Sequence, residues 1–474
     1  MELKELKEFI HLQKTVKGNA LKDIIGDYAI NKWLREGGKG FLEAFTGFGK
    51  TYLCRKLFKR YRTKFDDNIV VLVPNTNLYN DFVAIGKELE LTNYYVYIIN
   101  TYVLTDKEVV RDCGLLIVDE LHRFCSELSD YFKTAIPKTN FTRALGLSAT
   151  LEQKHKDFLK TFGIEEIFSI NLTEGIRLDL IPEFEVLNVG INLSNEDKES
   201  FLKQDKLFKS TFRYFTLLGH NSFELMMACS MGSDVNYKVN VFGIITTANC
   251  DVWRTQVMLQ SGLYDNLDTV ERLKKIKALA FQCRSAMQAR ETIINNSPAK
   301  LKALVTILNT LSQQNVDKDI KDYSLSFVSS IEQADLIEKE MHLKALAYHS
   351  KLTAANKRNR LSNYSLGVFE HLLTISALDE GFSNKKISIG INCAFTSKVR
   401  TAIQRMGRII RLDADNIKKA PLFIFLYHLP YFTLDEEADE VLPNDYKKLN
   451  SLQNDMSNIK NITLEQCLEI IRKR

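Results

Sequence analysis

The sequence predicts an α/β protein with two lobes, each built on a doubly wound parallel sheet, and a mainly helical insert between them. Short apolar runs of strand length recur in two separate parts of the 474-residue chain, with helical segments between the runs. Runs that are apolar throughout are typical of parallel strands that helices cover on both faces. The stretch between the two parts lacks this rhythm and spaces its apolar residues as helices do.

The apolar runs locate the strands of both lobes. In the first lobe they are KGFLEAF (39–45), NIVVLVP (68–74), YYVYIIN (94–100), GLLIVDE (114–120) and RALGLSA (143–149). In the second lobe they are YSLSFVS (323–329), KALAYHS (344–350), HLLTIS (371–376), ISIGINC (387–393) and PLFIFLY (421–427). We therefore expect a first lobe at 1–193, the insert at 194–300, a second lobe at 301–435 and a helical tail at 436–474. Within the insert, NYKVNVFGIITT (236–247) could instead form one or two strands.

Composition indicates an ordinary globular protein. Hydrophobic residues make up 45% of the chain, charged residues 26%, and there are only 7 prolines. A net charge of +5 is too small for this length to indicate nucleic acid by itself. The 8 cysteines are scattered, without the paired spacing of zinc sites or disulfide frameworks. No signal-peptide pattern or apolar run of membrane length is found, so we expect a protein of a bacterial or host cytoplasm, without a membrane partner. The sequence does not determine the oligomeric state, and a monomer is our expectation.

A glycine-containing turn follows the first apolar run. The stretch AFTGFGKTYLC (44–54) leads from a strand, through the turn, into the apolar start of a helix, which is the context of a P-loop. Glycines let successive backbone N–H groups face a phosphate, and the helix N-terminus favours negative charge. We expect Lys50 to reach the β- and γ-phosphates and Thr51 to bind Mg²⁺. The residues expected around the phosphates are Thr46, Gly47, Phe48, Gly49, Lys50, Thr51 and Tyr52. On this motif alone, a glycine-rich surface turn remains the alternative.

Two carboxylates follow the fourth apolar run. In LLIVDELHRF, the strand delivers Asp119 and Glu120 at its carboxyl end, where α/β sheets bind ligands. Asp119 can hold Mg²⁺, and Glu120 can orient and deprotonate a water molecule. Hydrolysis of a phosphoanhydride needs that metal charge and a positioned nucleophile. Alone, an acidic pair at this place is more often a helix cap or a solvated turn, but downstream of a P-loop lysine it indicates catalysis.

These motifs form part of an ordered set. AFTGFGKT, DELH and LGLSAT stand in the order and approximate spacing of motifs I, II and III of superfamily 2 helicases, a family that the chain resembles. VLVPNTNL (71–78) and IINTYVL (98–104) look like motifs Ia and Ib, whereas SFVSSIEQA (326–334), ISALDEGFS (375–383) and QRMGRIIR (404–411) look like motifs IV, V and VI. The resemblance implies RecA-like lobes that hold ATP and Mg²⁺ between them. It implies that His122, Ser148 and Thr150 couple the nucleotide state to lobe movement. It also places Asp379, Glu380 and Gly381 at the nucleotide and strand junction.

Motif VI suggests arginine fingers. Arg408 and Arg411 stand three residues apart on an expected helix and therefore point from one face. Guanidinium groups match phosphate oxygens, so the second lobe could contact a nucleotide that the first lobe holds. Two solvated arginines would be the default interpretation if Gln404 and Gly407 did not complete the Q-x-x-G-R-x-x-R spacing, which the resemblance assigns to the nucleotide-facing side.

Nucleic-acid contacts are expected at the remaining motifs. Backbone tracking needs hydroxyls, amides and helix N-termini aimed at phosphates. The candidates are Asn75, Thr76, Thr101, Ser329 and Ser330. The basic run RKLFKRYRTKF (55–65) fits a solvated helix exterior better than a nucleic-acid contact. An adenine-reading glutamine would fall near Gly26, which has no amide side chain, so ATP is carried over from the family.

We therefore predict an ATP-dependent DNA helicase or translocase. The DELH sequence and the spacing of residues 348–383 resemble DNA-directed members, including phage-type helicases that remodel forks and four-way junctions, and the insert is the candidate for recognising branched DNA. Replication or recombination proteins are the partners this implies. An RNA helicase is the second hypothesis, because backbone contacts do not exclude RNA. A nucleotide-gated nucleic-acid clamp and the motor subunit of a restriction or defence complex are further alternatives.

Overall fold

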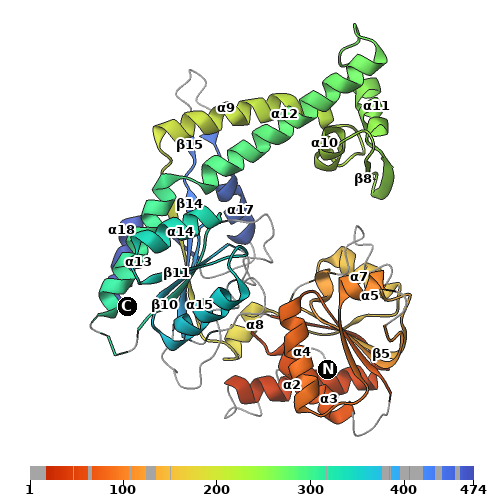
Figure 1. The fold of residues 1–474 in the computed structure, drawn as a ribbon, viewed down its shortest axis with the longest axis vertical. Coiled ribbons are helices and arrows are strands. Elements are labelled where there is room, and N and C mark those ends of the chain that lie inside the picture. Colours follow the sequence, from red (N-terminus) through yellow and green to blue (C-terminus); the bar gives the residue numbers. More distant parts are fainter. Residues whose placement is uncertain are drawn as a thin grey trace.

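The computed structural model has two α/β lobes and a long helical arm (Figure 1). It describes residues 18–45, 47–61, 67–105, 109–123, 135–149, 151–316, 318–319, 321–375, 384, 386–394, 405, 420–432, 440–453 and 459–474. Within these ranges, no helix combines the length and apolarity needed to cross a membrane.

The first lobe contains a six-stranded parallel sheet in the order β3-β2-β4-β5-β1-β6. Its strands are β1 (Lys39–Ala44), β2 (Ile69–Val73), β3 (Tyr94–Ile98), β4 (Asp112–Val118), β5 (Asn140–Ser148) and β6 (Glu166–Ile170). Its helices are α2 (Gly18–Arg35), α3 (Lys50–Tyr61), α4 (Thr76–Glu88), α5 (Ile99–Leu104), α7 (Gln153–Lys160) and α8 (Leu172–Arg177). The predicted strands are therefore confirmed, and β6 is an additional strand.

Alternate residues along each strand serve two separate cores. On β2, Val71 and Val73 pack with α2, α3 and α4, whereas Val70 and Leu72 pack with α5 and α7. Because side chains alternate across a sheet, strands that are apolar throughout can be covered on both faces. The helices therefore lie in two layers with the sheet between them, as the sequence predicted.

The second lobe is built on a seven-stranded parallel sheet in the order β11-β12-β10-β13-β14-β7-β17. Its strands are β7 (Glu185–Ile191), β10 (Tyr323–Phe327), β11 (Ala345–Tyr348), β12 (His371–Thr374), β13 (Ile387–Asn392), β14 (Leu422–His428) and β17 (Ile459–Ile462). Its helices are α13 (Pro298–Asn315), α14 (Ile331–Glu340), α15 (Ala354–Leu366), α17 (Asn444–Gln453) and α18 (Leu464–Lys473). A small ribbon pairs β15 (Tyr431–Phe432) with β16 (Glu440–Val441).

Two of these strands correct the predicted boundaries. Residues up to 193 were expected in the first lobe, but β7 pairs along its whole length with β14 of the second sheet. Residues 436–474 were expected to form a helical tail, but β17 pairs with β7 at the edge of the same sheet. The second sheet therefore recruits one strand from before the insert and one from the end of the chain.

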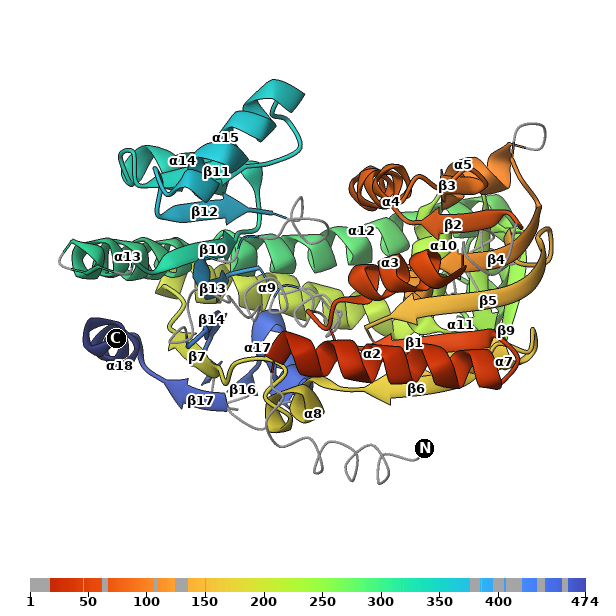
Figure 2. The ribbon, with the colours of Figure 1, turned by 90° about the horizontal axis from the view of Figure 1, so that it is seen from below.

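The insert forms an arm that leaves the second lobe after β7 and returns to it at α13. Two antiparallel helices, α9 (Asn195–Phe212) and α12 (Thr269–Asn295), form the stalk (Figures 1 and 2). At the far end, residues 213–268 form a distal module. It contains the short helix η2 (Arg213–Phe215), α10 (Ser222–Ser230), the antiparallel strands β8 (Asn236–Val241) and β9 (Ile244–Asn249), and α11 (Cys250–Ser261). The region that could form one or two strands is thus a β-hairpin.

Buried polar contacts fix the base of the arm to the second lobe. On α12, Arg290 lies 3.0 Å from Asp205 of α9 and donates to Asn444 Oδ1 at 2.9 Å. On α13, Lys300 Nζ donates to Asp445 Oδ2 at 2.7 Å, and the His428 Nδ1–H donates to the same oxygen at 2.8 Å. Arg290 and Lys300 thus contact Asn444 and Asp445, the first two residues of α17. This helix therefore links α12 and α13 to β14, which carries His428.

Charge compensation keeps Asp445 ionised in this buried cluster. Burial raises the pKa of the Asp445 carboxyl, but Lys300 and His428 outweigh that effect and lower it to about 2. A carboxyl whose pKa is lower in the folded state stabilises the fold above its unfolded-state value of about 3.9. This contribution is therefore present at neutral pH and is lost as the pH falls through about 2.

We predict that Lys300→Met destabilises the second lobe, because it leaves the buried Asp445 carboxylate without its cation. Removing one partner of a buried ion pair costs about 3–5 kcal/mol of unfolding free energy. Urea-induced unfolding monitored by far-UV circular dichroism measures this loss. Lys302→Met, on an exposed position of the same helix, is the matched control. Equal stability of the two variants would contradict the assigned role of the ion pair.

Candidate active site

The turn after β1 has a shape that depends on its glycines. Gly47 has a φ of 96° and Gly49 a φ of 102°, a region that residues with a side chain rarely adopt. Between them, Phe48 is buried and meets the Phe45 ring edge to face at a centroid distance of 5.6 Å. The turn leads directly into α3, whose first backbone N–H groups have no acceptor within the helix. The described part of the turn thus presents N–H groups and the positive end of a helix dipole.

Two lysines lie at this turn. Lys50, the first residue of α3, donates from Nζ to the Ala44 carbonyl at 3.1 Å. Lys22, on α2, donates from Nζ to the Gly47 carbonyl at 2.9 Å. No sequence pattern predicts this position of Lys22, because it depends on the packing of α2 against α3. At Gly26, where an adenine-reading glutamine was sought, an added Cβ would lie 2.9 Å from Leu53 Cδ1. Gly26 therefore serves the close approach of these two helices.

The two predicted catalytic carboxylates follow β4 directly. The Asp119 N–H donates to the Leu72 carbonyl at 3.0 Å and continues the pairing of β4 with β2. Asp119 is buried, and its Oδ1 accepts from the Glu120 N–H at 2.9 Å. Glu120 has a φ of 51°, so the chain turns sharply at this residue. Burial raises the pKa of Asp119 to about 7, and the Glu120 charge also raises it, whereas Lys50 lowers it. A cation at this carboxyl would remove that penalty.

A buried contact joins motif II to motif III. His122 Nδ1 lies 3.1 Å from Ser148 Oγ and 3.3 Å from Glu120 Oε2. Ser148 is the last residue of β5, the strand between β4 and β1, and it is fully buried. The imidazole of His122 thus bridges the Glu120 carboxylate and the end of the neighbouring strand. The fold brings together these residues, which the sequence placed in separate motifs.

The predicted nucleic-acid residues lie at the carboxyl ends of other strands. Asn75 caps α4 after β2, where its Oδ1 accepts from the Leu78 N–H at 3.0 Å. Ser330 caps α14 after β10, where its Oγ accepts from the Gln333 N–H at 3.2 Å. Thr76 and Thr101 are exposed on α4 and α5. Asn75 and Ser330 therefore also have structural roles as helix caps.

Several predicted site residues lie outside the described residues. They are Thr46, Thr150, Asp379, Glu380, Gly381, Gln404, Gly407, Arg408 and Arg411. Within motif VI the structure describes Arg405, which is buried and donates to Asn392 Oδ1 and the Ala394 carbonyl at 2.8 Å each, and to the Ile375 carbonyl at 3.2 Å. Its guanidinium carbon also lies 4.3 Å from the centre of the Phe327 ring. Arg405 thus fixes one point of motif VI beside the carboxyl ends of β12 and β13, a role that the spacing of the motif did not suggest.

The basic run after the P-loop is structural in its described part. Lys56 and Arg60 each lie 3.0 Å from Asp27 of α2, and Arg55 pairs with Glu88 of α4. Leu57 and Phe58 are buried on the opposite side of α3. These cations hold α3 against its neighbouring helices, which agrees with the interpretation as a helix exterior.

The chain matches two family models in order along its length. Residues 12–102 match the res subunit of type III restriction enzymes, and residues 299–413 match the helicase conserved C-terminal domain. A search among curated protein sequences finds no match.

Three solved structures align with this chain over most of its length. The structure of S. cerevisiae Dbp5 bound to RNA and ADP BeF3 aligns with a TM-score of 0.54 and 12% identity, over 99% of this chain and 96% of that one. The ATP-dependent Type ISP restriction-modification enzyme LlaBIII bound to DNA aligns with a TM-score of 0.52 and 12% identity, over 95% of this chain but only 33% of that one. The Hef helicase domain of Pyrococcus furiosus aligns with a TM-score of 0.47 and 14% identity, over 85% and 95% of the two chains.

At these identities the first two structures show a common fold, that of a two-domain helicase with RecA-like lobes. The family assignment comes from the sequence matches. One lies over the P-loop turn and the other over the second sheet, and both agree with the order of the motifs. The two sequence matches and the shared fold together support a superfamily 2 helicase, a family whose helicase domains imply hydrolysis of ATP.

Proposed function

We propose that this chain is an ATP-dependent DNA helicase or translocase that remodels forked or branched DNA. The observation that carries the proposal is the convergence of Lys50, Asp119 and Glu120 at one edge of the first sheet. The glycine-dependent turn offers N–H groups and two lysines to an anion, while the buried Asp119 carboxyl next to it is suited to a cation. An anion site beside a cation site is the arrangement that a metal-bound triphosphate requires.

The predicted site residues of the first lobe have distinct roles in the proposed hydrolysis. The backbone of residues 46–52 and the Lys50 ammonium bind the phosphates, and Thr51 and Asp119 would hold Mg²⁺. When bound, that ion supplies positive charge to the phosphate oxygens. Glu120 orients the attacking water and accepts its proton. His122, 3.3 Å from Glu120 Oε2, keeps this carboxylate oriented and relates its position to Ser148.

The second lobe would complete the site. We assign Glu380, Gly381 and Gln404 to contacts with the nucleotide, and Arg408 and Arg411 to neutralisation of the γ-phosphate as arginine fingers. Arg405 supports this assignment, because its hydrogen bonds place this residue of motif VI at the carboxyl edge of the second sheet. If ATP is bound best when both lobes contact it, binding favours closure and hydrolysis favours opening.

The choice of DNA rests on two features. The spacing around motif V resembles that of DNA-directed members, and the arm provides a separate element that could recognise a branch. The match to a restriction-enzyme subunit and the likeness to LlaBIII, which was solved with DNA, are compatible with this choice and also with a restriction or defence motor. Dbp5 was solved with RNA, so an RNA helicase is the second candidate. A clamp without processive movement is the third.

We predict that Lys50→Ala weakens ATP binding by about 10- to 100-fold, because a charge-assisted hydrogen bond to the phosphates is lost. Titration with a fluorescent ATP analogue measures the affinity. Lys59→Ala, on an exposed position of the same helix, is the matched control and should bind normally. If Lys50→Ala also binds normally, the turn is no nucleotide site.

We predict that Glu120→Gln keeps ATP affinity but lowers the steady-state hydrolysis rate by about 10²- to 10⁴-fold. The amide keeps the size of the side chain and leaves Asp119 unchanged, but it cannot accept the proton of water. Bound ATP should then hold the lobes closed, which small-angle X-ray scattering would detect as a smaller radius of gyration than that of the nucleotide-free protein. An unchanged turnover would remove Glu120 from the proposed chemistry.

We predict that forked or four-way DNA stimulates ATP hydrolysis more than single-stranded DNA, linear duplex or RNA. The reason is that both lobes and the arm can engage a branched substrate together. A coupled ATPase assay with these cofactors at matched nucleotide concentration measures the difference. Stimulation by RNA alone would favour the RNA helicase, and ATP-dependent DNA binding without displacement of a streptavidin block would favour the clamp. Streptavidin displacement from linear duplex without strand separation would favour the restriction or defence motor.

A further inference from the structure

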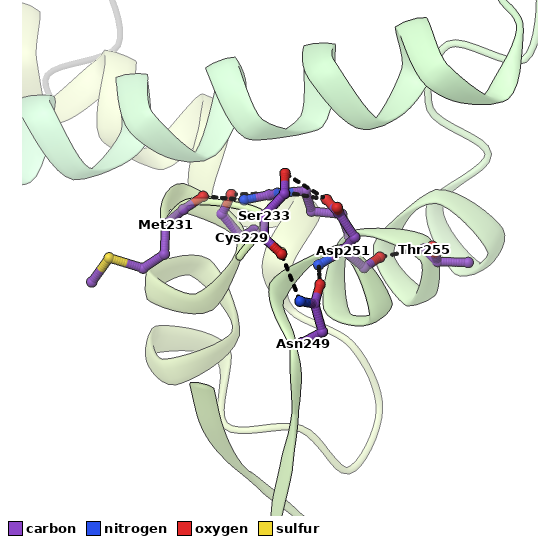
Figure 3. A network of polar contacts seen from close by, with 7 residues as sticks. Cys229, Met231, Ser233, Asn249, Asp251 and Thr255 are labelled. Carbon is purple, nitrogen blue, oxygen red and sulfur yellow. Dashed lines mark hydrogen bonds and ion pairs between the residues drawn. The ribbon is translucent and has the colours of Figure 1, made fainter. Parts of the chain in front are cut away.

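The distal module has a core of its own and a rigid frame. Buried side chains from η2, α10, β8, α11 and α12 pack together, among them Phe215, Leu225 and Trp253. The buried Arg254 of α11 donates from Nε to the Cys229 carbonyl at 2.9 Å and from Nη1 to Ser233 Oγ at 3.2 Å, and it also contacts Met231 and Asp251 (Figure 3). The Trp253 Nε1–H donates to the Tyr237 carbonyl of β8 at 3.1 Å. The base of the β8–β9 hairpin is thus held on two sides.

The hairpin turn carries an unusual residue. Only Phe242 and Gly243 separate β8 from β9, with φ values of 50° and 84°. A two-residue turn with positive φ at both positions normally contains Asn-Gly, because a bulky side chain is strained in this region. The Phe242 N–H donates to the Gly219 carbonyl at 2.6 Å, and a Cβ at Gly219 would lie 2.3 Å from the Phe242 ring. Phe242 therefore has a strained backbone, and its ring packs against Gly219, where a larger residue would collide with it.

This arrangement exposes apolar surface instead of burying it. The side chains of Phe242, Ile244 and Leu218 are 72%, 70% and 84% exposed. We call these three residues the apolar tip. Folding gains little from them, whereas the turn geometry costs free energy. Backbone strain that folding does not require points to a functional contact.

The surroundings of the apolar tip favour a polyanion. Residues 206–223 and 235–250, which contain the tip, include Lys206, Arg213 and Lys238, and they also include Lys209, which pairs with Asp205 at 2.8 Å; Asp234 and Asp251 flank the second segment. Lys206, Lys209 and Arg213 recur at helical spacing and are exposed. The nearest following carboxylate, Glu224, accepts from the Asn240 N–H at 2.7 Å and so serves the hairpin itself. Exposed apolar side chains on a hairpin that carries Lys238, with Arg213 exposed on the adjoining η2, suit nucleic acid, whose bases are apolar on their faces and whose backbone is anionic.

The arm also brings the tip to the expected nucleic-acid path. Figure 1 shows the distal module above the end of the first lobe that carries α5 and α7, with β8 on the side that faces it, and in Figure 2 the module overlaps the same lobe. Helix α5 carries Thr101, one of the predicted phosphate contacts. A duplex that enters along that surface would approach the hairpin.

We infer that the apolar tip contacts unpaired or terminal bases of nucleic acid where a duplex opens or branches. Phe242 stacks on a base, Ile244 and Leu218 cover its neighbour, and the nearby cations bind the adjoining phosphates. This inference rests on the proposed function and assigns a specific base-contacting surface to the arm.

The substitution Phe242→Asn separates this contact from folding. It creates the Asn-Gly pair that the turn geometry favours, so the melting temperature should stay the same or rise. The affinity for forked DNA should fall about tenfold, because one stacking contact is lost. Basal ATP hydrolysis should be unchanged. Leu343→Asn is the matched control, since Leu343 is an 83% exposed apolar residue with a φ of 63° in the second lobe.

A forked DNA with 2-aminopurine at the last base pair before the branch reports the contact directly. The wild-type protein and Leu343→Asn should change the fluorescence of this base, and Phe242→Asn should not. Fork affinity, fluorescence and strand separation that are all unaffected in Phe242→Asn would overturn the inference. Loss of self-association in Phe242→Asn, with normal DNA binding, would overturn it in favour of a contact between copies of the chain. Failure of the wild-type protein to bind any nucleic acid would refute the proposed function as well.

Discussion

The site depends on the shared direction of the strands in the first sheet. Because all of them run parallel, their carboxyl ends meet at one edge, and the loops after β1, β4 and β5 become neighbours. This places the P-loop turn, Asp119 with Glu120, and Ser148 side by side although 104 residues separate Ala44 from Ser148. The loops after β2 and β3, with the predicted nucleic-acid residues, lie further along the same edge. Four strand spacings, about 19 Å, separate β1 from β3.

The contact between His122 and Ser148 lies between the proposed nucleotide site at β1 and the predicted nucleic-acid residues that follow β2 and β3. His122 and Ser148 follow β4 and β5, the two strands between β1 and β2 in the sheet. The His122 imidazole also contacts the Glu120 carboxylate. Ser148 is buried at a strand end, so the serine has little freedom to move alone. A displacement of Glu120 during hydrolysis would therefore be passed to the end of β5. His122 Nδ1 can interact with either Ser148 Oγ or Glu120 Oε2. An element with two alternative arrangements of this kind can couple two sites.

Local sequence patterns predicted most of the fold, and they single out the described residues of the proposed nucleotide site. Strands β1 to β5 and β10 to β14 are apolar runs that can be recognised singly, and Lys50, Asp119 and Glu120 follow such runs directly. The pairing of β7 was not predictable in this way, because its partner β14 lies more than two hundred residues downstream. Strand β17 is a polar edge strand without an apolar signal. Lys22 is positioned by the packing of helix α2, and Arg405 is positioned by its contacts at the carboxyl ends of β12 and β13. Motif spacing does not predict such contacts.

The base of the arm determines what the distal module can do. Arg290 and Lys300 tie α12 and α13 to adjacent residues of α17, so the arm is anchored in the second lobe by buried charges. Separation of α12 from α17 would break the buried hydrogen bond from Arg290 to Asn444, which costs free energy. Motion of the second lobe must then carry the arm with it. Helix α12 has 27 residues and is about 40 Å long, so a rotation of the lobe by about 10° would move the far end of the stalk by about 7 Å. This is about two base-pair steps of a duplex at about 3.4 Å each, so a modest closing movement at the nucleotide would suffice to shift the hairpin relative to bound nucleic acid.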